Sequence, residues 1–183
     1  MATVEIHADY RDYTPPAWVD RTVKRLLDSV SAPLTDLGAI VLTERIVATT
    51  RKGSRPMRRN KRGTPLGRYH PAWNGQAAWI EIVTDEIVAE WSGRPLANWQ
   101  FFRDRAIGRV LFHEIGHHLD RTIGATARSG ESAADAWMRT LWRQHARRHY
   151  WYLRPFKPAF AILGKFFSFM AARGRAQRHS KST

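Results

Sequence analysis

An HExxH sequence at residues 113–117, inside an apolar run, constrains this chain more than any other feature. The run from Asn98 to Ile123 has the apolar periodicity of a helix. Residues four apart lie on one face of a helix, so the imidazoles of His113 and His117 can bind one metal ion together. Glu114 lies beside them, where its carboxylate can accept a proton from a metal-bound water. The pattern predicts a zinc site with Glu114 as general base; the ordinary alternative is three surface residues of an amphipathic helix.

A catalytic zinc ion needs a third protein ligand, and the residues alone leave several candidates. The metzincin continuation requires glycine at position 120 and histidine at position 123, whereas the chain has Asp120 and Ile123, which excludes that family. Gly124 is a candidate C-cap, so we expect the helix to end there and a second helix to begin near Glu131. The candidate third ligands after His117 are Asp120, Glu131, Asp135, His145, His149 and His179. Asp120 can also support a ligand, or form an ordinary salt bridge.

Residues 110–138 resemble the gluzincin clan of zinc metallopeptidases, and are most similar to the compact ImmA/IrrE-type metallopeptidases. The resemblance rests on HEIGH at 113–117 and on the sequence Glu-Ser-Ala-Ala-Asp-Ala that begins at Glu131. The resemblance implies that His113, His117 and Glu131 are the zinc ligands. It also implies that Glu114 is the general base and that the Asp135 carboxylate supports a ligand histidine. Such a carboxylate orients a ligand imidazole by accepting its free N–H. For Glu131 the alternative is a favourable charge in the first turn of a helix.

The rest of the chain predicts a single α+β domain around this helix. Its 183 residues, 43% of them hydrophobic, suffice for one core, and the absence of cysteine excludes disulfides and thiolate zinc sites. We expect strands at residues 3–8, 38–47 and 76–85, a helix from Thr14 to Ser31, and a second helix after the metal helix that extends to Leu153. Together with the resemblance, this predicts a zincin-like domain at 1–153 with a small mixed sheet, an HExxH helix and a glutamate-bearing helix after it.

Basic residues dominate two segments, and the formal net charge is +14. Residues 51–68 contain eight Lys and Arg and no acid, which predicts a basic loop that either contacts phosphates or is simply solvated. Residues 154–173 predict a basic amphipathic helix, which can dock on a membrane surface or nucleic acid, or pack on the domain. Residues 174–183 are expected to be a disordered tail. DNA or another polyanion is therefore a candidate partner through the 51–68 loop and the C-terminus.

These features predict a zinc-dependent metallopeptidase that hydrolyses protein or peptide substrates. The strand at 76–85 is expected to be the sheet edge that pairs with an extended peptide. The candidate oxyanion donors are Tyr69, His70, His145, His149, Tyr150 and Tyr152. The alternative function is a basic nucleic-acid or membrane-surface binding protein with a structural or vestigial zinc site. Without a signal peptide or a transmembrane run in the sequence, the expected location is cytoplasmic.

Overall fold

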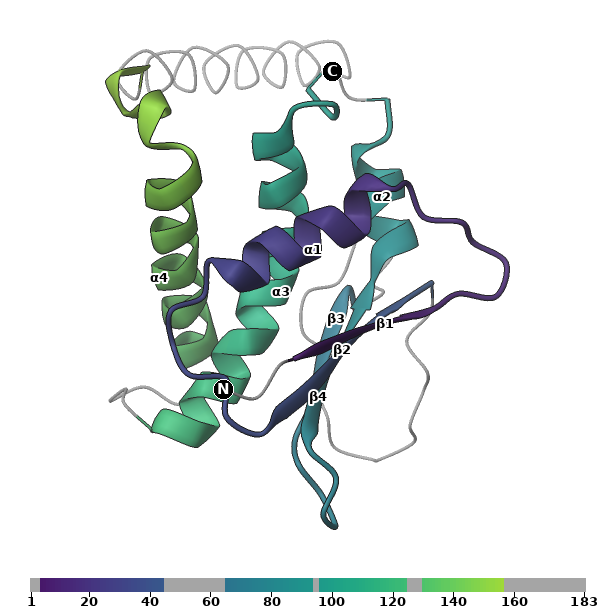
Figure 1. Cartoon of the computed structure of the whole chain (residues 1–183), viewed down its shortest axis with the longest axis vertical. Helices are drawn as coiled ribbons and strands as arrows, with labels where there is room; N and C mark the ends of the chain where they lie inside the picture. The colour runs from purple at the N-terminus through teal and green to yellow at the C-terminus, as the bar shows by residue number, and fades with distance from the viewer. Residues whose placement is uncertain (1–3, 45–64, 94–95, 125–129, 157–183) are drawn as a thin grey trace, which may run out of the picture. The chain divides into compact units, whose positions relative to one another are not determined.

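The computed structural model describes residues 4–44, 65–93, 96–124 and 130–156 (Figure 1). In chain order the elements are β1 (Glu5–Asp9), α1 (Trp18–Asp28), β2 (Leu37–Thr43), β3 (Gly67–His70), β4 (Ala78–Val83), α2 (Thr84–Trp91), α3 (Gln100–Ile123), α4 (Glu131–His149) and a 3-10 helix (Trp151–Phe156). The chain divides into two compact units, Met1–Ala146 and Arg147–Thr183. Most of the predicted helix at 154–173, the predicted tail at 174–183, and residues 51–64 of the predicted basic loop lie outside the described residues.

The first unit contains a mixed four-stranded sheet in the order β1-β2-β4-β3. Strands β1, β2 and β4 are parallel, and β3 is antiparallel to β4. The helix α1 connects β1 to β2, which is the crossover that parallel neighbours require. The predicted α+β class with a small mixed sheet is therefore confirmed for the described residues.

The position of β4 corrects the prediction of an edge strand at residues 76–85. Strand β4 lies between β2 and β3, so β3 forms one edge of the described sheet and β1 forms the other. A hairpin through Asn74 and Gly75 joins β3 to β4, and both residues have positive φ, 47° and 80°. Asn-Gly is the favoured pair for such a turn because both central positions need positive φ. The short strand β3 was missed because it begins inside the segment predicted as a basic loop, and Arg68 lies in it.

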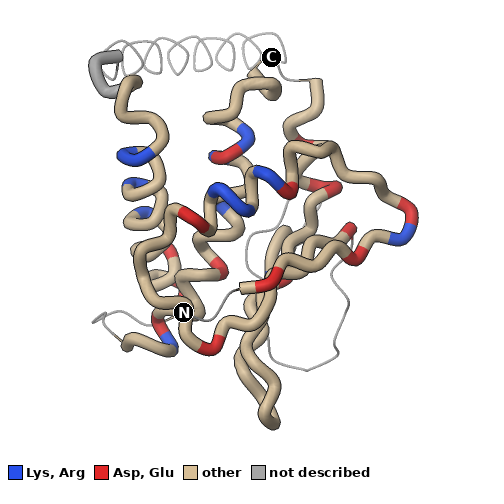
Figure 2. The backbone as a smooth tube through the Cα atoms, viewed as in Figure 1, with Lys and Arg blue, Asp and Glu red and all other residues tan. Residues whose placement is uncertain are grey.

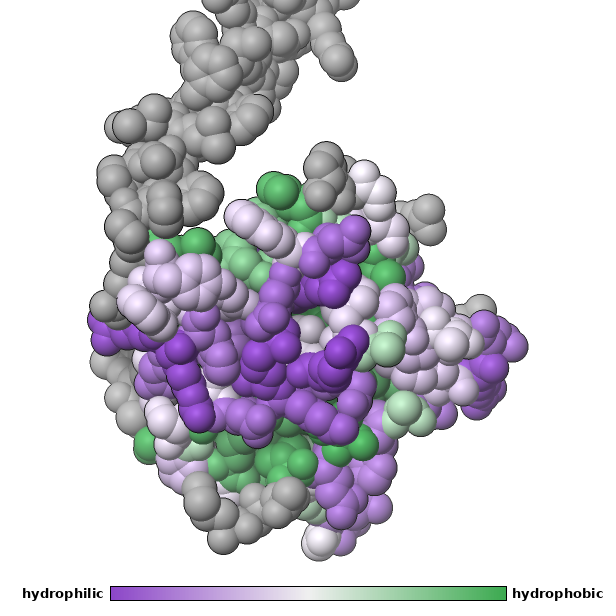
Figure 3. Space-filling view, turned by 45° about the horizontal axis from the view of Figure 1, so that its top comes forward, coloured by the Kyte–Doolittle hydropathy of each residue, from purple (hydrophilic) through white to green (hydrophobic). Residues whose placement is uncertain are grey.

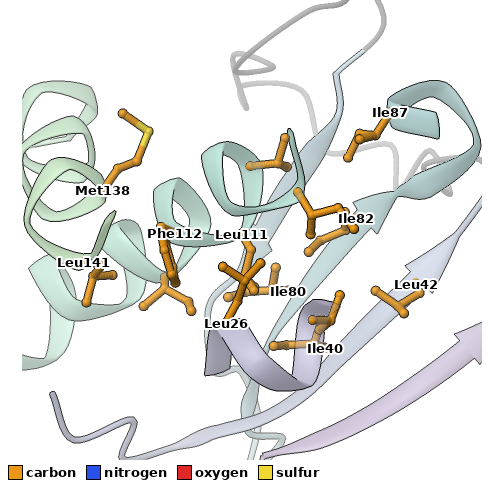
Figure 4. Close-up of a cluster of buried hydrophobic side chains, with 14 of the residues drawn as sticks. Leu26, Ile40, Leu42, Ile80, Ile82, Ile87, Leu111, Phe112, Met138 and Leu141 are labelled. Atoms are coloured by element: carbon orange, nitrogen blue, oxygen red, sulfur yellow. The ribbon is translucent and has the colours of Figure 1, made fainter. Parts of the chain in front are cut away.

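A single apolar core lies between the sheet and the helices of the first unit. Leu26 of α1 and Leu111 of α3 pack with Ile40 and Ile80 of the sheet, and all four are fully buried (Figure 4). Alternate residues of the two central strands, such as Ile80 and Ile82 of β4, face the core, as the twofold periodicity of a strand requires. Burying a side chain of this size contributes about 1.5–3 kcal/mol, so this layer fixes the direction of α3 across the sheet.

The helix boundaries agree with the sequence at the end of α3 and at the start of α4, which begins at Glu131 as expected. Helix α3 ends before Gly124, which has a left-handed φ of 58°, so the predicted C-cap is confirmed. Helix α4 ends at His149 instead of Leu153, and the chain continues as a 3-10 helix. Helix α2 was not predicted, because its short sequence was interpreted as a connection.

A buried polar cluster joins α1, α3 and α4 in the core. The Asp104 carboxylate, fully buried, accepts hydrogen bonds from Arg25 and is 2.8 Å from Nε2 of His145. Nδ1 of His145 is 2.9 Å from Oγ of Ser29, which itself donates to the carbonyl of Leu26. Because the single hydroxyl proton of Ser29 is used there, Nδ1 of His145 is the donor to Ser29. Both ring nitrogens of His145 are thus engaged in holding three helices together.

On the face of the molecule that Figure 3 shows, the described residues are mainly hydrophilic, with smaller apolar areas between them. Among the described residues, no helix has the length and apolar character needed to cross a membrane.

We predict that Asp104→Ala destabilises the fold by about 3–5 kcal/mol, because it leaves Arg25 without its buried counter-charge and Nε2 of His145 without its hydrogen-bond partner. Urea denaturation followed by circular dichroism measures the loss. The control is Asp20→Ala, which removes an exposed carboxylate that is 2.8 Å from Lys24 on α1. That change is expected to cost less than about 1 kcal/mol. Equal losses in the two variants would show that the Asp104 cluster is not a structural anchor.

Candidate metal centre

His113 and His117 lie in the second half of α3, one turn apart. Their ring centroids are 5.1 Å apart and their planes are nearly perpendicular, at 86°. His113 is buried, with 2% of its surface exposed, whereas His117 is half-buried. The spacing that the sequence predicted on one helix face is therefore present.

Helix α4 crosses α3 at very short range at Gly116, inside the HExxH sequence. A Cβ atom at Gly116 would lie 2.6 Å from the carbonyl oxygen of Ala134 and 2.9 Å from its Cα. Only a residue without a side chain allows the two backbones to approach so closely. Ala133 and Ala134 are completely buried in this contact region. The crossing places the first turn of α4 beside the histidines.

Glu131, at the start of α4, completes a group of donors with the two histidines. One donor atom from each of His113, His117 and Glu131 lies within 4.8 Å of the others, which is a set that can hold a metal ion. Nε2 of His113 is 3.7 Å from Oε2 of Glu131. The Glu131 side chain is 62% exposed, so the group opens toward solvent on that side. The convergence of the predicted ligands is confirmed.

Asp135 supports His113 from the side opposite to Glu131. Its Oδ1 lies 3.0 Å from Nδ1 of His113. An ionised carboxylate only accepts, so Nδ1 of His113 carries the proton of this hydrogen bond. That tautomer leaves Nε2, the nitrogen on the Glu131 side, as the ring atom that can bind a metal. The supporting role that the resemblance implied for Asp135 agrees with this geometry.

Glu114 is buried against strand β3 and is not part of the donor group. A Cβ atom at Gly67 of β3 would lie 3.0 Å from Oε1 of Glu114 and 2.5 Å from Cγ1 of Val110. The backbone of β3 therefore forms the wall behind the candidate base. Gly67 and Gly116 are closely packed positions beside the candidate site that the sequence reasoning missed, although a glycine within a helical HExxH sequence is itself a signal of close packing.

The pKa of His117 is lowered from 6.5 to about 4. Burial is the main cause, and the nearby charges of His113 and Arg121 lower the pKa further, while Asp120 and Asp135 act in the opposite direction. The His117 imidazole is consequently neutral at pH 7, which is the form that binds a metal.

The other predicted site residues lie in different surroundings. Asp120 is outside the donor group and accepts a hydrogen bond from the backbone N–H of Gly130, at 3.3 Å, so it supports the start of α4. His145 belongs to the buried Asp104 cluster, which rules it out as a ligand or an oxyanion donor. His149, Tyr150 and Tyr152 belong to the second unit and stay predictions.

Tyr69 and His70, both on β3, point to different partners. The Tyr69 hydroxyl is 3.3 Å from Nδ1 of His118, the residue after the second ligand, and burial raises the pKa of Tyr69. His70 stacks on Trp79 and lies 3.3 Å from Glu81. Sequence reasoning did not select His118, which is fully buried and ties α3 to the edge strand.

No protein-family model, curated protein or solved structure matches this chain. What these residues can do must therefore follow from their chemistry and placement. Two imidazoles and one carboxylate are nitrogen and oxygen donors of the kind that zinc binds in open, catalytic sites. A fourth side chain, that of Glu114, follows His113 directly in the sequence and is outside this donor group.

We predict that Gly116→Ala destabilises the protein by about 1–3 kcal/mol, because the new methyl group collides with the backbone of Ala134. The metal affinity should fall as well, since Glu131 is displaced. The control is Gly108→Ala on the same helix, where the nearest atom, Cδ2 of Leu26 at 3.2 Å, belongs to a side chain that can move. Both variants gain the same helix propensity, so the difference between their urea midpoints isolates the collision. Equal midpoints would contradict a tight crossing.

A second prediction concerns the pH dependence of the metal-free protein. Above pH 6.5 His117 is neutral in both the folded and the unfolded chain, so it does not affect the free energy of unfolding. Between pH 6.5 and about 4 the unfolded chain binds a proton that the folded chain does not, so stability falls as the pH falls. His117→Gln should therefore reduce the loss of stability between pH 7.5 and pH 5, measured by urea denaturation at both values. The same change at the exposed His7 is the control, and an unchanged loss in His117→Gln would contradict the assignment.

Proposed function

We propose that this chain is a zinc-dependent metallopeptidase with a zincin-like domain. The observation that carries the proposal is the convergence of His113, His117 and Glu131. Asp135 contacts Nδ1 of His113, and Glu114 follows His113 directly on the same helix. The resemblance of residues 110–138 to the compact ImmA/IrrE-type metallopeptidases supports the same assignment. A structural zinc site would need a fourth protein ligand, and the group in the described residues has three.

The side chains divide the work of peptide hydrolysis between binding and proton transfer. When bound, zinc lowers the pKa of a coordinated water to about 7 and polarises a carbonyl group. Glu114 accepts the proton of the water and afterwards donates it to the leaving amine. The wall formed by Gly67 keeps the Glu114 side chain in place, and Asp135 keeps the His113 ring in the ligand tautomer.

Strand β3 is the proposed contact for an extended peptide substrate. It forms the edge of the described sheet that lies next to the candidate base, because its Gly67 lies against Glu114. An extended peptide that added a strand there would run past the candidate base. Tyr69, one of the candidate oxyanion donors, lies on the same strand, and its hydroxyl is 3.3 Å from Nδ1 of His118.

Polyanion binding is a second candidate function, and the net charge of +14 is the observation that favours it. Basic residues follow one another along the later part of α4, and Arg139 and Arg143 are both exposed and one turn apart (Figure 2). Such a row attracts phosphates with a strong dependence on salt concentration. A peptidase with this surface would be concentrated near nucleic acid, and its protein substrates would be those bound there.

We predict that Glu114→Gln keeps the metal and loses peptidase activity by a factor of about 10²–10⁴, the usual contribution of a general base. Zinc content by mass spectrometry and cleavage of a casein mixture are measured on the same samples. Glu131→Gln should lose both the metal and the activity, because it removes a ligand. Asp135→Asn should retain activity at saturating zinc but bind zinc about 10–100-fold more weakly.

Three outcomes would change the assignment. Full activity in Glu114→Gln would remove Glu114 from the proton transfer. Unchanged zinc content in Glu131→Gln would remove Glu131 from the ligands. A wild-type protein that holds zinc, never cleaves casein and is retained on duplex DNA with a steep salt dependence would support the polyanion binder instead.

A further inference from the structure

A cavity of about 430 Å³ lies at the opposite end of α3 from the metal centre. Its walls come from the start of α1, the end of α2 and the chain that leads into α3, segments that are close together in Figure 1. None of the three candidate metal ligands lines it. The volume is within the range of pockets that bind small organic molecules, and the cavity has no role in the proposed peptide hydrolysis.

The walls combine flat apolar surfaces with a single charge. Trp18 and Trp91 contribute two indole rings, and Pro16 and Val88 add further apolar surface. Among the described residues that line the cavity, Arg103 is the only one with a charged side chain. A ligand that fills this space must therefore be largely apolar, and any charged group on it must be negative.

Arg103 is held in place but has no carboxylate partner among the described residues. Its Nε donates to the carbonyl of Ala97 and its Nη2 to Oδ1 of Asn98, both at 3.0 Å. Its guanidinium lies over the ring of Trp18, 5.0 Å from the centroid. These contacts use two of the five N–H groups of a guanidinium. A half-buried, fixed arginine without a counter-ion is a site prepared for an anion.

We infer that this cavity binds a small organic anion with a flat apolar body, such as an aromatic carboxylate. The indoles of Trp18 and Trp91 contact the flat body, and the unused N–H groups of Arg103 bind the carboxylate. Helix α3 begins at Gln100, so the positive end of its dipole adds to the charge of Arg103. The bound anion would provide the counter-charge that Arg103 lacks within the described chain.

Isothermal titration calorimetry of the full chain with 1-naphthaleneacetate tests the inference. Saturable binding at one site per chain is expected for the wild type, and Arg103→Met should weaken it at least tenfold, because methionine keeps apolar bulk but removes the charge. The control is Arg109→Met, an exposed arginine on the same helix that does not line the cavity. It lowers the net charge equally and should change the affinity less than twofold.

A neutral probe keeps the test independent of any variant. The wild type should bind 2-(1-naphthyl)ethanol, which has the same ring system without the carboxylate, at least tenfold more weakly than the acid. Equal affinities for the two probes, equal effects of Arg103→Met and Arg109→Met, or no saturable binding to the wild type would each overturn the inference. Metal content and peptidase activity do not enter these measurements, so the result is separate from that of the proposed function.

Discussion

The contact between the backbones of Gly116 and Ala134 is the constraint on which the candidate centre depends. The HExxH sequence provides two imidazoles on one helix, but a third ligand must come from another element. The crossing at Gly116 brings α4 so near that Glu131 and Asp135 reach opposite nitrogens of the same His113 ring. A larger residue at position 116 would separate the helices and move both carboxylates together, so one glycine controls the ligand and its supporting residue.

Helix α3 carries three separate tasks along its length. Its first turns line the cavity at Arg103, the buried Asp104 anchors it to α1 and α4, and its second half carries the histidines. From Asp104 to His113 the helix rises about 14 Å, at 1.5 Å per residue. The anchor therefore fixes the rotation of α3, and with it the direction in which the histidines point, without contacting them.

The local parts of the site could be predicted from the sequence, whereas the parts that depend on tertiary contacts could not. Helical spacing alone placed His113 and His117 together, and Gly124 ended the helix where its left-handed φ was expected. The choice of Glu131 over Asp120 as ligand came only from the resemblance, because spacing along a chain does not say how two helices cross. His145 was misjudged for the same reason, since its partners Asp104 and Ser29 are distant in sequence.

Strand β3 shows a different limit of sequence reasoning. It is four residues long, begins with glycine and adjoins a basic segment, so neither alternation nor composition marks it as a strand. The Asn74-Gly75 turn was the available signal, because it predicts a hairpin whose second strand is β4 and whose first strand must precede it. Because β3 was not recognised, β4 was predicted to be the sheet edge. For the same reason, the contact between the backbone of β3 and Glu114 was not predicted.

The exposure of the donor atoms bears on how the centre assembles. His113 is buried on α3, whereas the side chain of Glu131 is 62% exposed and that of Asp135 is 41% exposed at the start of α4. An exposed carboxylate near a histidine contributes at most about 1 kcal/mol, so these side-chain contacts alone hold the first turn of α4 only weakly. A metal ion bound by residues of both helices would link α3 to α4 and gain affinity from every contact that already aligns them. The tight crossing at Gly116 therefore supplies the preorganisation, and the exposed Glu131 leaves the way open for the ion to enter.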